Sequence, residues 1–443
     1  MLTAIQRITC MKIYTYPSKE ARRRVQQVAG RDLGFKKKDL QAVTRILEDV
    51  RKNGDSAVVK YSRQFDAPKI TVGALRATAS EISGALKQVD RPFVRSLNKA
   101  IKQIESFHRQ QLPTSWIDTR REGTMLGQVV HPVNVAGVYV PGATGGTTPL
   151  VSSVLMGAIP ARVAGVKEII MVTPSRKDGS IDPHLLVAAK KAGVKSVFKV
   201  GSAWAIGALA YGTRTIPKAD VIVGPGNVYV TLAKKIVSGT VGIDMLAGPS
   251  EILIIADETA DPVYIAADML SQAEHDSLAS SVLLTTSPEI AKATAAQVKK
   301  QLPRLSRKDI ARASINRFGT ILVVPDIQAA IGIANDFAPE HLELLVGEPF
   351  NLVGSLKNAG AIFVGAHTPE PVGDYIAGPN HVLPTAGTAR FSSALSVDTF
   401  IKKTSLIHYN REAFKKDAAD IIRLASIEGL DAHANAIRVR LKG

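Results

Sequence analysis

The sequence has one cysteine, Cys10, in 443 residues. A single thiol cannot form an intramolecular disulfide or supply a thiolate-rich metal cluster. No segment offers about 18 uninterrupted apolar residues, the length that a membrane-spanning helix needs. The opening run MLTAIQRITCMKIYTY lacks the apolar centre of a secretory signal. We therefore expect a cytoplasmic protein without a membrane partner, in which any metal ligands are His, carboxylate or amide groups.

Aromatic residues are also scarce, at 5% of the chain, whereas the formal net charge is +17. Such a basic excess suggests a polyanion partner, because Lys and Arg neutralise phosphates. The basic runs ARRRVQQ and KKKDLQ have few aromatics interleaved, however, and are typical of solvated helix faces. We expect no nucleic-acid partner, and a basic polyanion-binding protein is the least favoured class of function.

Lysine and arginine are missing altogether from residues 236–291. The same stretch holds nine acidic residues, so electrostatic potential that attracts cations is concentrated there. These residues are Asp244, Glu251, Asp257, Glu258, Asp261, Asp268, Glu274, Asp276 and Glu289.

The length and the 45% apolar content allow two or more domains, each with its own core. Residues 37–111 show apolar helical periodicity, and from about Met125 short β-branched runs such as NVAGVYV, VKEIIMV and DVIVG alternate with helical stretches. A second alternating series includes EILIIAD, SSVLLTT and TILVVPD, and the tail beyond Ala394 reads as helices. The predicted fold class is α/β, with two Rossmann-like doubly wound parallel-sheet domains and small helical terminal segments.

The glycine fingerprint of dinucleotide-binding sheets, G-x-G-x-x-G, is absent. Two weaker glycine clusters follow predicted strands, at Gly142–Gly146 and Gly224–Asn227. Each could contact a cofactor phosphate, but ordinary tight turns are the more common explanation of such clusters.

The run SQAEHD places Gln272 and His275 three residues apart at the end of a predicted amphipathic helix, Pro262 to Ala273. On a helix this spacing directs two side chains toward one ligand. An amide oxygen beside an imidazole suits a divalent metal with several oxygen ligands, and further ligands must come from elsewhere. The alternative is a hydrogen-bonding pair at the helix terminus.

Further polar groups lie downstream in APEHLEL, VGDYIAGPNHVLPT and EGLDAHANA. Pro339 predicts that a helix ends before Glu340 and His341. Because neighbours in extended chain point apart, we expect these two residues to have separate roles rather than to form one hydrogen-bonded dyad. A salt-bridge pair at a strand edge is the alternative.

From about Phe35 to the C-terminus the chain resembles the histidinol dehydrogenase family through these words and through AGVYVPG, SSVLMGAIPA, ALAYGT, VGPGNVYV, AGPSEIL and GTARFSS. The resemblance implies a zinc-dependent homodimer that oxidises the amino alcohol L-histidinol to L-histidine through the aldehyde, with two NAD per turnover. It also implies active sites shared between subunits. The nearest rival is a paralogous dehydrogenase of the family that acts on another primary alcohol, such as a sulfonated diol.

The resemblance also implies roles for individual residues. One Zn²⁺ per subunit is held by Gln272, His275, Asp374 and His433, while His341 is the base and Glu340 activates water. Further substrate contacts are Ser152, Ser250, His381 and Glu428, and the NAD contacts are Tyr139 and Asn227, with Trp204 at a position where the family has glutamine. A tryptophan there can stack on nicotinamide or ribose but cannot replace the amide's donor and acceptor.

Without a metal, structural roles are available to several of these residues. Asp374 can cap a turn, the two serines can cap helices or turns, and His381 can be a buried donor.

The predicted domain organisation follows the resemblance. Residues 1–35 form an N-terminal arm that packs with the C-terminal segments. Residues 36–138 and 251–394 form the main domain, with the helical layer and the metal site. Residues 139–250 form an inserted NAD-binding domain, and residues 395–443 form a helical dimerisation segment.

Overall fold

The computed structural model describes residues 11–31, 35–142 and 148–442. Cys10 and the glycines at 145 and 146 lie outside this range. The chain divides into two compact units: one holds the residues up to Gln111 and Asn134–Phe400, and the other holds Leu112–Val133 and the residues from Ile401. None of the helices in the described ranges combines the length and apolar character required for a membrane span.

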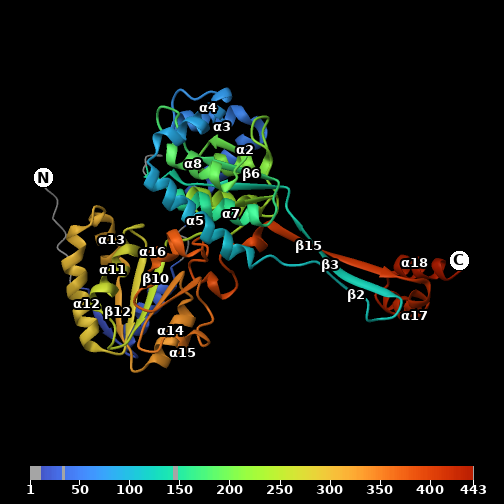
Figure 1. Ribbon diagram of the computed structural model, residues 1–443. Coiled ribbons are helices and arrows are strands. Elements are labelled where there is room, and N and C mark those ends of the chain that lie inside the picture. The colour runs from blue at the N-terminus through green and yellow to red at the C-terminus, as the bar shows by residue number, and fades with distance from the viewer. Residues whose placement is uncertain (1–10, 32–34, 143–147, 443) are drawn as a thin grey trace. The chain divides into compact units, whose positions relative to one another are not determined.

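The first unit contains a six-stranded sheet in the order β1-β12-β11-β10-β13-β14, in which every neighbouring pair is parallel (Figure 1). The residues of its interior strands are almost all buried, as expected for a parallel sheet covered on both faces. The strands are β1 (Ile13–Thr15), β10 (Glu251–Ala256), β11 (Ser280–Thr285), β12 (Thr320–Val323), β13 (His341–Leu345) and β14 (Ala361–Val364). The helices of this series are α11 (Pro262–Ala273), α12 (Pro288–Gln301), α13 (Lys308–Phe318) and α14 (Ile327–Phe337).

A second parallel sheet in the same unit has the order β7-β6-β4-β8-β9. The prediction of two doubly wound α/β domains is therefore confirmed. The strands of this second sheet are β4 (Val135–Tyr139), β6 (Glu168–Thr173), β7 (Ser196–Lys199), β8 (Val221–Val223) and β9 (Gly242–Ile243). Its helices are α7 (Val151–Val163), α8 (Pro183–Ala192), α9 (Ser202–Tyr211) and α10 (Val228–Val237).

The helical layer of residues 37–109 contacts this second sheet's helices. Helix α2 (Lys37–Asn53) packs on α9 and α10, and α5 (Arg91–Arg109) packs on α7. The layer also includes α3 (Asp55–Phe65) and α4 (Ala79–Ala85). Placing residues 36–138 with residues 251–394 is therefore wrong for α2, because its apolar face, with Leu47 and Val50, fits against Gly207 of α9. Helix α5 also contacts the π-helical turn at Gly373–Ala377, within residues 251–394, and the rest of the predicted domain division stays a prediction.

The N-terminal segment belongs to the six-stranded sheet over its described part. Strand β1 pairs with β12, and α1 (Lys19–Ala29) buries Ala21 and Val28 in the same core as β10 to β13. Its predicted contact with the C-terminal segments stays a prediction.

The second unit is a three-stranded antiparallel sheet, β15-β3-β2, followed by two helices that pack on each other. Its elements are β2 (Trp116–Asp118), β3 (Thr124–Pro132), β15 (Ile401–Tyr409), α17 (Arg411–Ile427) and α18 (Asp431–Leu441). The expectation that the tail beyond Ala394 is helical is correct for α17 and α18 but wrong for β15. That strand is exposed along most of its length, so it lacks the alternation of buried and exposed residues that marks a strand in a sequence.

The described residues also form several short elements. They are β5 (Thr148–Pro149), α15 (Phe350–Val353), α16 (Glu370–Val372), a π-helical turn at Gly373–Ala377, and 3-10 turns at Val72–Ala74, Leu86–Gln88, Leu302–Arg304, Thr388–Arg390 and Val397–Phe400.

The packing of α2 on the five-stranded sheet makes a testable prediction. Leu47 is 1% exposed, whereas Leu40 on the same helix is 41% exposed. We expect Leu47→Ala to lower the free energy of unfolding by about 2–5 kcal/mol, because it opens a cavity between α2 and α9. Urea unfolding followed by circular dichroism measures this change. Leu40→Ala is the control and should cost well under half as much; equal effects would contradict the assignment of α2 to this core.

Candidate active site

The candidate site lies at the amino ends of β10 and β13. Glu251 and His341 are the first residues of these neighbouring strands, and Ser250 immediately precedes Glu251. The carboxyl ends of strands are the usual ligand side in doubly wound sheets, so this edge is unexpected. Helix α11 runs back from the carboxyl end of β10, and its last turn brings Gln272 and His275 to the amino edge.

Gln272 and His275 occupy the end of α11 as predicted. The helix spans Pro262–Ala273, the bounds expected from the sequence, and His275 lies just beyond it. Gln272 is fully buried, and neither of its amide atoms has a hydrogen-bond partner among the described residues. A buried amide without a partner is costly, so these atoms point to a ligand.

Asp374 joins His275 in a cluster with Glu370. One ligand atom from each of the three residues lies within 4.8 Å of the others. Glu370 is 1% exposed and its Oε1 has no hydrogen-bond partner in the described part of the chain. The sequence analysis missed Glu370; its position four residues before Asp374 in a helical stretch was the available signal.

Glu370 makes hydrogen bonds with two neighbouring residues, Glu343 and Ser271. Its backbone N–H donates to Glu343 Oε1 (3.0 Å), and Ser271 Oγ–H donates to its Oε2 (3.1 Å). Burial raises the pKa of Glu343 well above its usual range, and the charge of Asp268 adds to this effect. Burial and the charge of Glu370 raise the pKa of Asp374 to about 8. Several carboxyl groups therefore share one poorly solvated region, where a bound cation would favour their ionised forms.

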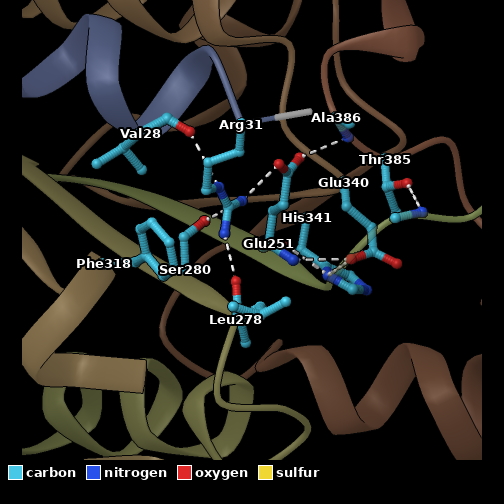
Figure 2. Close-up of polar contacts among 12 residues, drawn as sticks. Val28, Arg31, Glu251, Leu278, Ser280, Phe318, Glu340, His341, Thr385 and Ala386 are labelled. Atoms are coloured by element: carbon cyan, nitrogen blue, oxygen red, sulfur yellow. Dashed lines mark hydrogen bonds and ion pairs between the residues drawn. The ribbon is translucent and has the colours of Figure 1, made fainter. Parts of the chain in front are cut away.

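Glu340 and His341 face each other, and both are anchored on the main chain of Glu251 (Figure 2). The Glu251 N–H donates to Glu340 Oε2 (2.8 Å), and His341 Nδ1 lies 3.0 Å from the Glu251 carbonyl oxygen. The expectation that the two side chains point apart is wrong, since His341 Nδ1 and Glu340 Oε2 are 3.6 Å apart. Glu340 lies in a bend before β13, following Ala338 with φ 51°, so strand alternation does not apply to it. The 3.6 Å separation is longer than a hydrogen bond, so the two groups are not directly bonded.

The surroundings of His341 determine which of its ring nitrogens carries the proton. A carbonyl oxygen only accepts hydrogen bonds, so the Nδ1 beside Glu251 carries the proton and Nε2 keeps its lone pair. Burial lowers the pKa of His341, which favours this neutral form. Burial also raises the pKa of Glu340 well above its usual range, and the neighbouring charge of Glu251 acts in the same direction.

A cavity of about 120 Å³ lies beside these groups and is lined by His341, Phe363, Asp374 and His381 among others. His381 Nδ1 is 3.7 Å from Asp374 Oδ1, and burial lowers the pKa of His381 to about 4. Ser152 lies in the first turn of α7. The structure thus brings the predicted residues Gln272, His275, Asp374, His341, Glu340, His381 and Ser250 to one edge of the sheet.

Glu428 and His433 belong to the second unit, where each is exposed. Glu428 is the C-cap of α17, and His433 lies in the first turn of α18. Their predicted roles in substrate and metal binding stay predictions.

The three predicted cofactor contacts have different surroundings. Asn227 caps α10, where its Oδ1 accepts hydrogen bonds from the N–H groups of Tyr229 and Val230. Tyr139 is buried, and its hydroxyl accepts from Ser202 N (3.2 Å). Trp204 is 4% exposed, donates to Ser62 Oγ (3.1 Å) and stacks with Tyr61 and Phe65. The expectation that Trp204 stacks on the cofactor is not supported, because the helical layer already covers its ring.

The donor set fits a divalent cation. Gln272 and Glu370 have unpartnered buried atoms, and His275 and Asp374 supply imidazole nitrogen and carboxylate oxygen at the same point. Mixed nitrogen and oxygen ligands without thiolate are compatible with zinc in a catalytic site.

Fold and site together define an α/β enzyme with two parallel sheets and a buried centre of imidazole, carboxyl and amide groups. A family profile described as histidinol dehydrogenase matches residues 31–441. The histidinol dehydrogenase of Desulfotalea psychrophila is 60% identical over 90% of this chain and 92% of its own length, and that of Carboxydothermus hydrogenoformans is 53% identical over 90% and 93%. The crystal structure of histidinol dehydrogenase from Elizabethkingia anophelis matches with a TM-score of 0.91, 38% identity and 98% coverage of both chains.

The chain belongs to the histidinol dehydrogenase family and is an oxidoreductase of the NAD-dependent class.

The cluster around Glu370 makes a prediction about metal binding. We expect Glu370→Gln to weaken zinc binding by about 10- to 100-fold, because Asp374 and His275 lose the carboxylate that orients them and adds negative charge. Competition against a chromophoric chelator measures the affinity. His367→Ala changes an exposed histidine nearby and is the control. Equal zinc affinity in the two variants would remove Glu370 from the site.

Proposed function

We propose that this chain oxidises L-histidinol to L-histidine through L-histidinaldehyde, with two NAD reduced per turnover, as the last step of histidine biosynthesis. The observation that carries the proposal is the meeting of a neutral, buried imidazole with carboxyl and metal-type donors at one sheet edge. The family membership of the chain supports the same reaction.

In the proposed mechanism His341 is the general base. Its Nε2 takes the hydroxyl proton of the substrate while Nδ1 remains bonded to the Glu251 carbonyl. Glu340 activates the water that adds to the aldehyde, a task suited to a carboxyl group with a raised pKa. Each group thus acts at a different stage, although the same strand end holds both.

Zinc, held by Gln272, His275, Asp374 and His433, would fix the amine and imidazole nitrogens of the substrate. NAD would accept the hydride in each of the two oxidations. The remaining substrate contacts are proposed to be Ser152, Ser250, His381 and Glu428, with Tyr139 and Asn227 toward the cofactor.

We further propose a homodimer whose second unit contributes Glu428 and His433 to the site of the partner. Several large apolar side chains of this unit are exposed, which favours burial against another chain. They include Ile407 (71% exposed), Leu424 (63%) and Ile427 (77%).

The reaction itself is tested by its stoichiometry. We expect about two NADH per histidinol consumed, since oxidation of an alcohol to an acid releases four electrons. Absorbance at the NADH band and quantified histidine give the ratio. Sulfonated diols and other amino alcohols are the comparison substrates, and preferential turnover of one of them would replace histidinol in the proposal.

The shared site is tested by mixing two inactive variants. His341→Ala should abolish oxidation but keep its zinc, and His433→Ala should lose activity because its partner's site lacks a ligand. In a mixed dimer one site then has both native residues, so co-refolding should restore up to about one quarter of the wild-type rate.

The two variants refolded separately and then combined without exchange are the control. No recovery in verified mixed dimers would mean that His433 serves its own subunit.

A further inference from the structure

Glu251 connects the two proposed catalytic groups through its main chain. Its N–H holds Glu340 at 2.8 Å and its carbonyl oxygen holds His341 Nδ1 at 3.0 Å. These two main-chain groups belong to the peptide units on either side of the Glu251 Cα, so a shift of this residue's main chain changes the placement of both side chains. Glu251 is the first residue of β10. It pairs with Ser280 of β11, whereas the pairing of β10 with β13 begins one residue later, at Ile252.

The side chain of Glu251 is fixed by a buried ion pair (Figure 2). Its Oε1 lies 2.6 Å from Arg31 Nη2, and its Oε2 accepts from Ala386 N (3.3 Å). The side chains of Arg31 and Glu251 are 8% and 3% exposed. Because both carboxylate oxygens are occupied, the Glu251 side chain is anchored at its far end as well as at the backbone.

Arg31 is in turn held by several fixed groups. Its guanidinium donates to Leu278 O (2.6 Å), Ser280 Oγ (2.7 Å) and Val28 O (3.0 Å), and it lies 5.0 Å from the centre of the Phe318 ring. These acceptors belong to α1, to the first residue of β11 and to the turn that precedes β11. A planar fork with several donors can satisfy them at once, whereas an ammonium group cannot.

We infer that Arg31 is a positioning residue for the catalytic pair: through its ion pair with Glu251 it sets the main chain of Glu251, whose N–H and carbonyl orient Glu340 and His341. This inference rests on the proposed roles of these two residues. A buried ion pair is poor evidence of stability, since well-packed apolar residues often stabilise a core as well or better. Its geometric effect on Glu251 is the feature that an apolar pair would not reproduce.

The test compares Arg31→Met, Glu251→Gln and the double variant with Arg24→Met. Arg24 is the matched control, because it lies on α1 and bonds Thr320 Oγ1 and the carbonyls of Arg317 and Gly319 without contacting Glu251. For each protein we measure kcat, KM for histidinol, zinc per subunit and the melting temperature.

We expect Arg31→Met and Glu251→Gln to lower kcat by about 10- to 100-fold with zinc content unchanged and KM altered less than about threefold, since small misplacements cost rate more than binding. The double variant has no unpaired buried charge, so its melting temperature should recover while its kcat stays low. Arg24→Met should lose stability but keep its kcat per folded subunit.

Recovery of kcat together with stability in the double variant would overturn the inference, as would a wild-type kcat in Arg31→Met. If Arg31→Met does not fold, Glu251→Gln decides in its place: it removes the ion pair and leaves Arg31 intact, so a wild-type kcat there equally overturns the inference. A wild-type protein without histidinol oxidation, or a fully active His341→Ala, would instead refute the proposed function.

Discussion

The site depends on one constraint: several carboxyl groups are buried together with too few positively charged side chains beside them to balance their charge. Glu340, Glu343, Glu370 and Asp374 lie at or near the start of β13, and Glu251 is the neighbour for which the described residues supply an arginine. Water cannot solvate these groups, so they must take up protons or share a cation. The unpartnered amide of Gln272 favours the cation, because its oxygen is a suitable ligand for a divalent metal ion.

The location at the amino edge follows from the same constraint. Helix α11 ends at this edge, and the unpaired carbonyl groups of a helix C-terminus carry partial negative charge. A cation is therefore attracted by the helix end as well as by the carboxylates. The carboxyl edge of the sheet would present helix N-termini instead, which suit phosphates. A metal-centred site and a phosphate-centred site thus belong on opposite edges of such a sheet.

Local patterns in the sequence predict much of this arrangement. The alternation of β-branched and helical runs predicts both parallel sheets, and the amphipathic pattern of Pro262 to Ala273 predicts α11 with its bounds. The predictions that are wrong concern features that tertiary contacts determine. Ala338 in a left-handed conformation turns Glu340 toward His341, and the packing of α3 on α9 takes Trp204 into a core. Strand β15 could not be predicted, because both of its faces are exposed and no hydrophobic periodicity marks it.

The contact between Arg31 and Glu251 marks the limit of such prediction. The two residues are 220 positions apart, and Arg31 belongs to no periodic element or motif. In the sequence it is one basic residue among many, and Glu251 is one of nine acidic residues in a stretch without Lys or Arg. The pairing of β1 with β12 and the packing of α1 on the same core bring the end of α1 beside the start of β10 and β11. An ion pair between residues that are far apart in the sequence therefore holds the main chain of Glu251, on which the proposed chemistry depends.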